Sequence, residues 1–190
     1  MRVIAGVHRG RRLLGPTGQA IRPTADRVKE ALFSILGDRT MGARMLDLYA
    51  GTGAIGIEAL SRGAEQVTFV EMDRQALRLV HANLQACEMA HLAQVCTCRV
   101  EQFFRRGTQW TGPYDIVFCD PPYHATPDLL ACIQAWEPRW LSQEAVVVLE
   151  HGRKAEIPDR IGPVVRVKRY DYGDTALTLF RPVSKDDRIT

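Results

Sequence analysis

The 190-residue chain has no apolar run that approaches the ~20 residues needed to span a bilayer. Its first residues, MRVIAGVHRGRRLLG, also lack the apolar core and small-residue cleavage site of a signal peptide. No internal repeat, linker or low-complexity segment divides the sequence, and a hydrophobic share of 46% is ordinary for a globular domain. These absences predict one globular domain that works in the cytoplasm.

The sequence lacks an arrangement of cysteines suited to cross-linking. The five cysteines are odd in number and form no paired CxxC clusters: Cys87, Cys96, Cys98, Cys119 and Cys132. Reduced thiols packed in apolar segments therefore fit better than a disulfide framework or a zinc site. The five histidines show no ligand spacing either. We expect no metal.

The net charge is small, at +3, but it is unevenly distributed. The first 40 residues hold eight basic and three acidic side chains, a balance of +5, which leaves −2 for the other 150 residues. A basic head on a slightly acidic body favours contact with a polyanion at one end of the molecule. The alternative is a solvated surface on which charges cluster by chance.

Apolar, strand-like runs alternate with amphipathic helical patterns between residues 43 and 151. This alternation predicts a doubly wound, mostly parallel α/β sheet of the Rossmann-like type with right-handed crossovers. Two further strand-like runs near the C-terminus should close the sheet as an antiparallel pair, giving seven strands. The predicted organisation is a basic arm or hairpin over 1–22, the main domain over 23–182 and a tail over 183–190.

The string LDLYAGTGAIG places Gly51, Gly53 and Gly56 in a GxGxxG pattern directly after the first expected strand. Alone this pattern is a weak signal, because many such strings are ordinary tight turns. Here a helical pattern follows, and Glu71 ends the second strand 20 residues beyond Gly51. Glycines let the backbone approach a ligand closely, and the acid can accept hydrogen bonds from ribose hydroxyls. The pattern therefore predicts a nucleotide-type cofactor.

Asp47, which lies just before this loop, helps to choose between cofactors. A carboxylate there would sit badly beside the pyrophosphate of NAD. It would instead suit S-adenosylmethionine, whose charged groups include a sulfonium and an ammonium. We therefore favour S-adenosylmethionine, with Asp47 beside it. The alternative is that Asp47 is simply a hydrogen-bonded carboxylate at the end of a strand.

The tetrapeptide Asp120-Pro121-Pro122-Tyr123 follows the apolar run YDIVFC, at the expected carboxyl end of a central strand. It could be a proline-rich turn and nothing more. Beside a sulfonium cofactor, however, the Asp120 carboxylate and the Pro121 carbonyl could hold both N–H groups of an exocyclic base amine and aim its lone pair at the methyl group. Pro122 would complete the kink, and Tyr123 would stack on a flipped or unstacked base.

These motifs together resemble a known family. DLYAGTG, VEMD and DPPY resemble the class I nucleic-acid amino-methyltransferases. RPTADRVKEALF and GAIGIEALSRGA narrow the resemblance to the ribosomal RNA small subunit methyltransferase D family, over Arg2 to about Arg181. The resemblance implies methyl transfer from S-adenosylmethionine to a guanine N2 amine of 16S rRNA, in the small ribosomal subunit or an assembly intermediate. We expect no membrane partner, and nothing in the sequence demands more than a monomer.

The resemblance also implies roles for individual residues. Ala50, Gly51 and Gly53 would line the methionine end of the cofactor, Glu71 the ribose, and Met72 and Val100 the adenine. Arg99 stands where relatives often have Asp or Asn, and it cannot accept a hydrogen bond from adenine. The residues implied to contact RNA phosphates are Arg9, Arg11, Arg12, Arg22, Arg27 and Lys29. Arg27 and Lys29 could instead form local helix pairs.

Three other functions stay open on the sequence alone. A DNA adenine or cytosine amino-methyltransferase would share the DPPY chemistry, but such enzymes usually carry a target-recognition domain for which 190 residues leave no room. An NAD-dependent oxidoreductase would share the glycine loop. A non-catalytic RNA-binding module would share the basic head.

Overall fold

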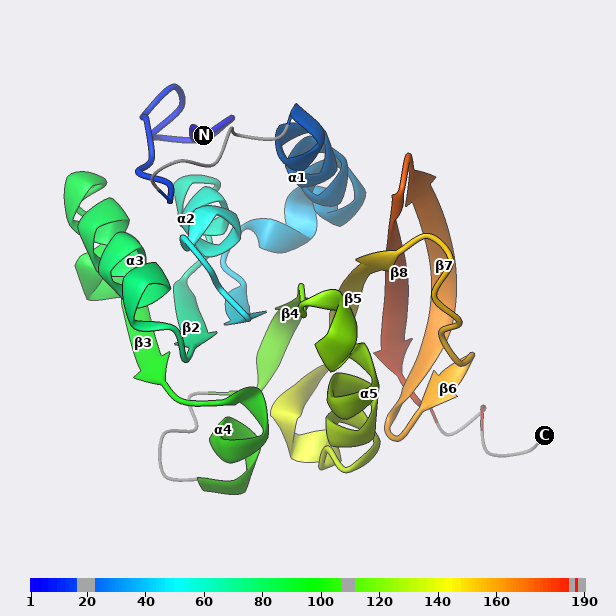
Figure 1. The fold of residues 1–190 in the computed structure, drawn as a ribbon. Coiled ribbons are helices and arrows are strands. Elements are labelled where there is room, and N and C mark those ends of the chain that lie inside the picture. The colour runs from blue at the N-terminus through cyan, green and yellow to red at the C-terminus, as the bar shows by residue number, and fades with distance from the viewer. Residues whose placement is uncertain (17–22, 107–111, 185–186, 188–190) are drawn as a thin grey trace.

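A mixed eight-stranded sheet forms the centre of the computed structural model, which describes residues 1–16, 23–106, 112–184 and 187 (Figure 1). The strand order is β3-β2-β1-β4-β5-β8-β7-β6. The strands are β1 Arg44–Leu48, β2 Gln66–Glu71, β3 Ala93–Thr97, β4 Tyr114–Cys119, β5 Leu141–Gly152, β6 Arg160–Ile161, β7 Val164–Tyr172 and β8 Thr175–Pro182.

The first five strands in this order are parallel, and β8, β7 and β6 are added antiparallel. This arrangement confirms the predicted doubly wound, mostly parallel sheet with an antiparallel C-terminal part. The sheet has eight strands rather than the predicted seven, because β6 pairs with the start of β7. A strand of two residues is too short to leave an alternating pattern in the sequence.

Helices cover both faces of the parallel part (Figure 1). The α-helices are α1 Pro23–Leu36, α2 Ala54–Ser61, α3 Arg74–Ala86, α4 Val100–Arg106 and α5 Thr126–Gln134; short 3-10 helices span Gly37–Thr40, Ala90–Leu92, Tyr123–Ala125 and Pro138–Trp140. Leu32, Ile57 and Val80 bring α1, α2 and α3 into the apolar cluster on one face. Phe103 and Leu129 bring α4 and α5 into the cluster on the other. No helix in the described ranges is long and apolar enough to cross a membrane.

The direction of strand addition reverses at β1. The chain moves outward from β1 through β2 to β3, and then returns to the other side of β1 as β4. Open α/β sheets bind ligands outside the carboxyl ends of the strands at such a reversal. Leu48 pairs with Cys119, and the Asp120 N–H donates to the Leu48 carbonyl at 3.4 Å. The glycine loop after β1 and the DPPY loop after β4 therefore open at the same edge of the sheet.

The N-terminal segment forms an arm that lies against α2 and α3 (Figure 1). Arg2 and Arg12 make a single antiparallel bridge within it. Glu58 of α2, which is fully buried, accepts hydrogen bonds from the backbone N–H groups of Ile4 and Ala5 at 2.7 and 2.9 Å. The arm is therefore held to α2 by backbone contacts as well as by side chains.

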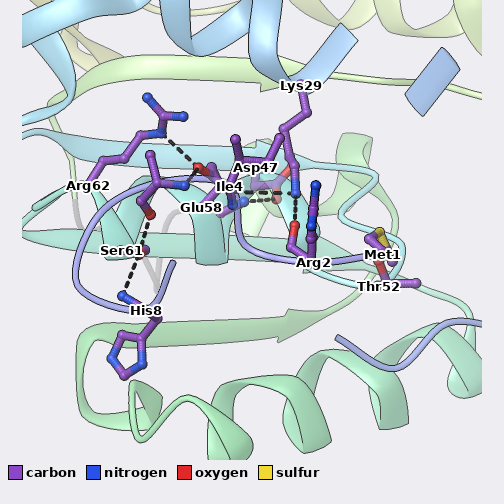
Figure 2. A network of polar contacts seen from close by, with 12 residues as sticks. Met1, Arg2, Ile4, His8, Lys29, Asp47, Thr52, Glu58, Ser61 and Arg62 are labelled. Carbon is purple, nitrogen blue, oxygen red and sulfur yellow. Dashed lines mark hydrogen bonds and ion pairs between the residues drawn. The ribbon is translucent and has the colours of Figure 1, made fainter. Parts of the chain in front are cut away.

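Lys29 belongs to this contact, contrary to its prediction as an RNA-binding residue. Its ammonium group lies 3.5 Å from the Glu58 carboxylate and donates to the Arg2 carbonyl at 2.6 Å, while Arg62 contacts the same carboxylate at 2.8 Å (Figure 2). The Lys29 side chain is only 3% exposed. A buried charge is stable when it is paired, and a lysine in this position cannot also reach a phosphate in solution. Lys29 holds the arm in place.

Asn83 of α3 joins the arm to the glycine loop. Its side chain is completely buried. Its amide nitrogen donates to the carbonyls of Leu14 and Thr52, at 3.1 and 2.9 Å, and its oxygen accepts the Leu14 N–H at 2.7 Å. The Thr52 hydroxyl also contacts the sulfur of Met1 at 3.7 Å. The arm therefore packs directly behind the loop in which Thr52 lies.

Candidate active site and cofactor pocket

The three glycines of the loop after β1 serve two different needs. Gly51 and Gly53 have φ angles of 56° and 76°, a region that strongly favours glycine. Gly56 instead allows close packing, since a Cβ there would lie 2.3 Å from Cε1 of Phe69 in β2. The loop can thus turn sharply, begin α2 and set that helix close against the sheet.

Glu71 at the end of β2 is fixed by backbone donors. One carboxylate oxygen accepts the Gly51 N–H at 2.9 Å, and the other accepts the N–H groups of Met72 and Asp73, both at 2.8 Å. Asp73 in turn caps α3 by accepting from Gln75 and Ala76. A carboxylate has more acceptor positions than these three bonds use. Glu71 is therefore held beside the glycine loop with the capacity to bind hydroxyl groups.

Asp47 is buried beneath the loop. Its carboxylate accepts the Gly56 N–H at 3.0 Å, so it fixes the start of α2. Burial raises the pKa of Asp47 to about 7, with smaller contributions in the same direction from the charges of Asp120 and Glu71 and an opposing one from the Gly56 hydrogen bond. The hydrogen-bonded strand-end carboxylate that the sequence left as an alternative is thus present.

This burial gives a pH dependence of stability. Unfolded chains release an aspartic proton near pH 4, whereas folded Asp47 releases it near 7, so the folded state binds more protons between those values. The contribution of Asp47 to stability should therefore fall as pH rises through that window. In the variant Asp47→Asn, the amide oxygen can still accept the Gly56 N–H, but the side chain does not titrate in this pH range. We expect its melting temperature to rise relative to wild type between about pH 4.5 and 7.5. A difference that does not change with pH would contradict this.

Asp120 follows β4 at the same edge. The Asp120 residue is exposed at the surface, but the surrounding protein partly desolvates its carboxylate. This desolvation raises the pKa of Asp120 to about 6. Pro121 is buried and Pro122 is exposed, and the Pro122 carbonyl accepts the Ala125 N–H at 2.7 Å to begin a short 3-10 helix. The backbone of Tyr123 belongs to that helix, while its side chain lies outside the described part of the structure.

A pocket of about 360 Å³ opens between the ends of β1, β2 and β3 and the start of α4 and α5. Three residues predicted from the sequence line it together, namely Glu71, Met72 and Val100, and Arg99 also lies in its wall. Met72 is exposed and Val100 is buried. The pocket thus brings the Glu71 carboxylate and the apolar side chains of Met72 and Val100 to a single cavity, whose wall also contains Glu101 and Asp128. Within the described residues, no cluster of His, Cys, Asp or Glu could hold a metal ion.

Tyr49 is a pocket residue that the sequence reasoning missed. It has a φ of 61°, which is rare for a residue with a side chain, and its buried hydroxyl makes no hydrogen bond within the described residues. Burial raises the pKa of this phenol above its ordinary value. Its position directly before the glycine turn was the only available signal. A strained backbone and a buried hydroxyl without a partner are typical of a residue that contacts a bound ligand.

The family is established by comparison with known proteins. A family model described as Conserved hypothetical protein 95 matches residues 1–181. The ribosomal RNA small subunit methyltransferase D of Escherichia coli K12 is 37% identical over 155 residues, which cover 79% of this chain and 74% of the relative. The chain belongs to the ribosomal RNA small subunit methyltransferase D family. The Haemophilus influenzae member is 36% identical over 150 residues, covering 79% of this chain and 78% of the relative.

Solved structures agree with this family membership. The yhhF protein of Escherichia coli superposes with a TM-score of 0.82 at 33% identity, over 97% of this chain and 99% of that chain. The predicted class I methyltransferase fold and the predicted family are therefore confirmed. The chain is a methyltransferase, and S-adenosylmethionine is its methyl donor.

The pocket suits this donor by its own chemistry. Glu71 offers carboxylate oxygens where a ribose would need acceptors, and the apolar side chains of Met72 and Val100 in the cavity wall suit a flat adenine. Asp47, Glu71 and Asp120 also gather negative charge at this edge, which favours a sulfonium over a pyrophosphate. The residues present therefore fit S-adenosylmethionine better than NAD.

Proposed function

We propose that this enzyme methylates the exocyclic N2 amine of a guanine in 16S rRNA, acting in the cytoplasm on the small subunit or an assembly intermediate. One observation carries the reaction type: Asp120 and Pro121 leave β4 beside the glycine loop of β1, because Leu48 and Cys119 are paired neighbours. The names of the family members support ribosomal RNA as the substrate.

The residues of the DPPY loop supply orientation rather than a strong base. An exocyclic amine is a poor nucleophile because its lone pair is delocalised into the ring. The Asp120 carboxylate and the Pro121 carbonyl would accept its two N–H groups and turn its lone pair toward the electrophilic methyl that bound S-adenosylmethionine supplies. Pro121 and Pro122 fix the backbone at this point, so the acceptors are held before the base arrives. Tyr123 is proposed as the stacking surface for the base.

The remaining site residues are proposed to hold the cofactor. Glu71 would bind the ribose hydroxyls, and Asp47 would lower the energy of the nearby positive charge. The other proposed contacts are Ala50, Gly51 and Gly53 at the methionine end and Met72 and Val100 at the adenine. Two observations support these assignments: Glu71, Met72 and Val100 line the pocket, and the carboxylates of Glu71 and Asp47 accept the N–H groups of Gly51 and Gly56.

The function is tested by methyl transfer to defined nucleic acids. The enzyme is incubated with labelled S-adenosylmethionine and small subunits from cells that lack this modification, and the product is digested to nucleosides. Free 16S rRNA and duplex DNA are tested in parallel. We expect label in N2-methylguanosine from the ribosomal substrate. Label in adenosine or cytidine, or in DNA alone, would overturn the proposal.

The arm is proposed to contact RNA phosphates through its exposed arginines. Arg9, Arg11 and Arg12 are exposed, as is Arg27 on α1, whereas Arg22 lies outside the described residues. Arg11 donates to the Ala86 carbonyl and so is tied to the end of α3. Lys29 is removed from this set because it is buried. The contact surface proposed here is thus the outer side of the arm and the start of α1.

Charge removal on the arm should change how binding responds to salt. Each lost phosphate contact lowers the slope of log affinity against log salt by roughly 0.7 to 1. The double variant Arg9→Gln, Arg12→Gln should therefore bind small subunits more weakly, with a slope reduced by about 1 to 2. Arg139→Gln is the matched control, since Arg139 is an exposed arginine of the short helix Pro138–Trp140. Equal slopes for the arm variant and the control would contradict the prediction.

A further inference from the structure

Glu150 of β5 stands beside Asp120 at the carboxyl edge of the sheet. Phe118 pairs with Val148 and Cys119 with Leu149, so the next step of the register places Asp120 opposite Glu150. Alternate residues of a strand point to opposite faces, and paired residues of parallel strands point to the same face. Glu150 therefore projects from the face of Val148, the same face as Asp120.

The surroundings of Glu150 are poor in donors. The residue is half-buried, and no hydrogen bond or ion pair to its carboxylate is formed within residues 1–16, 23–106, 112–184 and 187. Burial raises the pKa of Glu150 to about 8, and the charge of Asp120 adds to this effect. Two adjacent carboxylates without a shared donor are unfavourable in the free protein. Such a pair is suited to a ligand that brings its own hydrogen-bond donors.

Among the bases with an exocyclic amine, guanine is the one whose ring nitrogen next to that amine carries a hydrogen-bond donor. Its N2 amine lies next to N1–H, so the edge that carries the target amine presents a row of donors. In adenine and cytosine the ring nitrogen beside the amine is an acceptor. Adjacent strands lie about 4.8 Å apart, which lets side chains from β4 and β5 converge on neighbouring atoms of one base. Asp120 and Pro121 are already assigned to the amine, which leaves the ring N–H for the next strand.

We propose that Glu150 accepts the N1–H hydrogen bond of the target base and thereby selects guanine over adenine and cytosine. This inference rests on the proposed function. Hydrogen bonding to the charged form of a carboxylate favours that form, so N1–H would stabilise ionised Glu150 in the complex. Above pH 8, where free Glu150 is ionised, a base with an acceptor at this position would face a charged carboxylate that repels its lone pair. Glu150 is thus a specificity residue, distinct from the groups that hold the amine.

The test uses two bases that differ at N1 and in the 6-oxo group, and the change that Glu150→Gln makes in their ratio isolates the contribution of Glu150. Small subunits are reconstituted with rRNA that carries guanine or 2-aminopurine at the position methylated in the wild-type assay. Both bases carry the 2-amine, but N1 of 2-aminopurine is an acceptor. Assayed above pH 8, where Glu150 is ionised, wild type should strongly prefer guanine. Glu150→Gln offers an amide that can either accept or donate, so its preference, the ratio of kcat/KM for guanine to that for 2-aminopurine, should fall at least about tenfold.

The controls separate specificity from structure. Glu144→Gln changes an exposed glutamate nearer the start of the same strand and should leave the preference unchanged. Glu150→Asp keeps the charge and should keep the preference for guanine while lowering the rate. If Glu150→Gln fails to fold, Glu150→Asp still tests whether a carboxylate at this position sets the preference. Affinity for S-adenosylmethionine, measured by calorimetry, should stay near wild type in each variant.

The failures of the two proposals are distinguishable. If wild type does not methylate the guanine substrate, the proposed function fails, and the Glu150 proposal falls with it. If wild type does methylate guanine, and Glu150→Gln lowers both substrates equally, only the role of Glu150 is overturned. Loss of cofactor affinity in Glu150→Gln, or loss of the guanine preference in Glu150→Asp, would likewise overturn it.

Discussion

Replacing Asp120 with Ala should lower kcat for methyl transfer about 10²- to 10³-fold, the range seen when one preorganised hydrogen-bonding group is removed from an active site. The reason is that Pro121 alone cannot hold both N–H groups of the amine. Affinity for S-adenosylmethionine should change little, because Glu71 and the glycine loop keep their mutual contacts. Single-turnover rates with small subunits and calorimetry with S-adenosylmethionine measure the two quantities separately.

Asp120→Asn provides the matched comparison. The amide keeps one acceptor oxygen but adds a donor group, so the rate should fall less than in Asp120→Ala. If Asp120→Ala retained more than about a tenth of the wild-type rate, the loop could not be the site that orients the amine. Equal losses in cofactor affinity and in rate would place Asp120 in the cofactor site instead.

Replacing Glu58 with Ala should destabilise the folded chain by about 3–5 kcal/mol, the usual effect of removing one partner from a buried ion pair. The Glu58 side chain is fully buried, and its loss would leave Lys29, which is 3% exposed, without its ion-pair partner. The N–H groups of Ile4 and Ala5 would lose their acceptor as well. Urea unfolding followed by circular dichroism measures the change in free energy.

A surface ion pair gives the contrast. Arg139 and Glu137 contact each other at 2.9 Å, but their side chains are 58% and 60% exposed. Glu137→Ala should therefore cost less than about 1 kcal/mol. If Glu58→Ala were no more destabilising than Glu137→Ala, the buried network would not be what holds the arm to α2.

The sequence was a good guide to the parts of the site that depend on local chain geometry. Gly51 and Gly53 require φ angles that few other residues adopt, and Glu71 ends a strand at a fixed spacing from them, so each leaves a mark within about 20 residues. The alternation of strands and helices predicted the parallel sheet for the same reason. The strand order then brought the two loops together.

The roles of residues that depend on partners far away in the sequence could not be predicted from local patterns. The resemblance assigned Lys29 to the phosphate contacts, with a local helix pair as the alternative, whereas its partner Glu58 lies on another helix. Glu150 looked like the end of an apolar strand, and only the pairing of β4 with β5 shows it beside Asp120. For Tyr49 the only signal was its position before the glycine turn. For Lys29 and Glu150 the missing information was tertiary.

The bond pattern of Asn83 has a thermodynamic consequence. One buried side chain is shared by Leu14 of the arm and Thr52 of the glycine loop, so neither segment can open without breaking bonds that hold the other. Such segments open together as one cooperative unit. Residues 1–16 of the arm are also held against α2 and α3 before any RNA is bound, so their conformational entropy is lost on folding and does not weaken the later encounter with a polyanion.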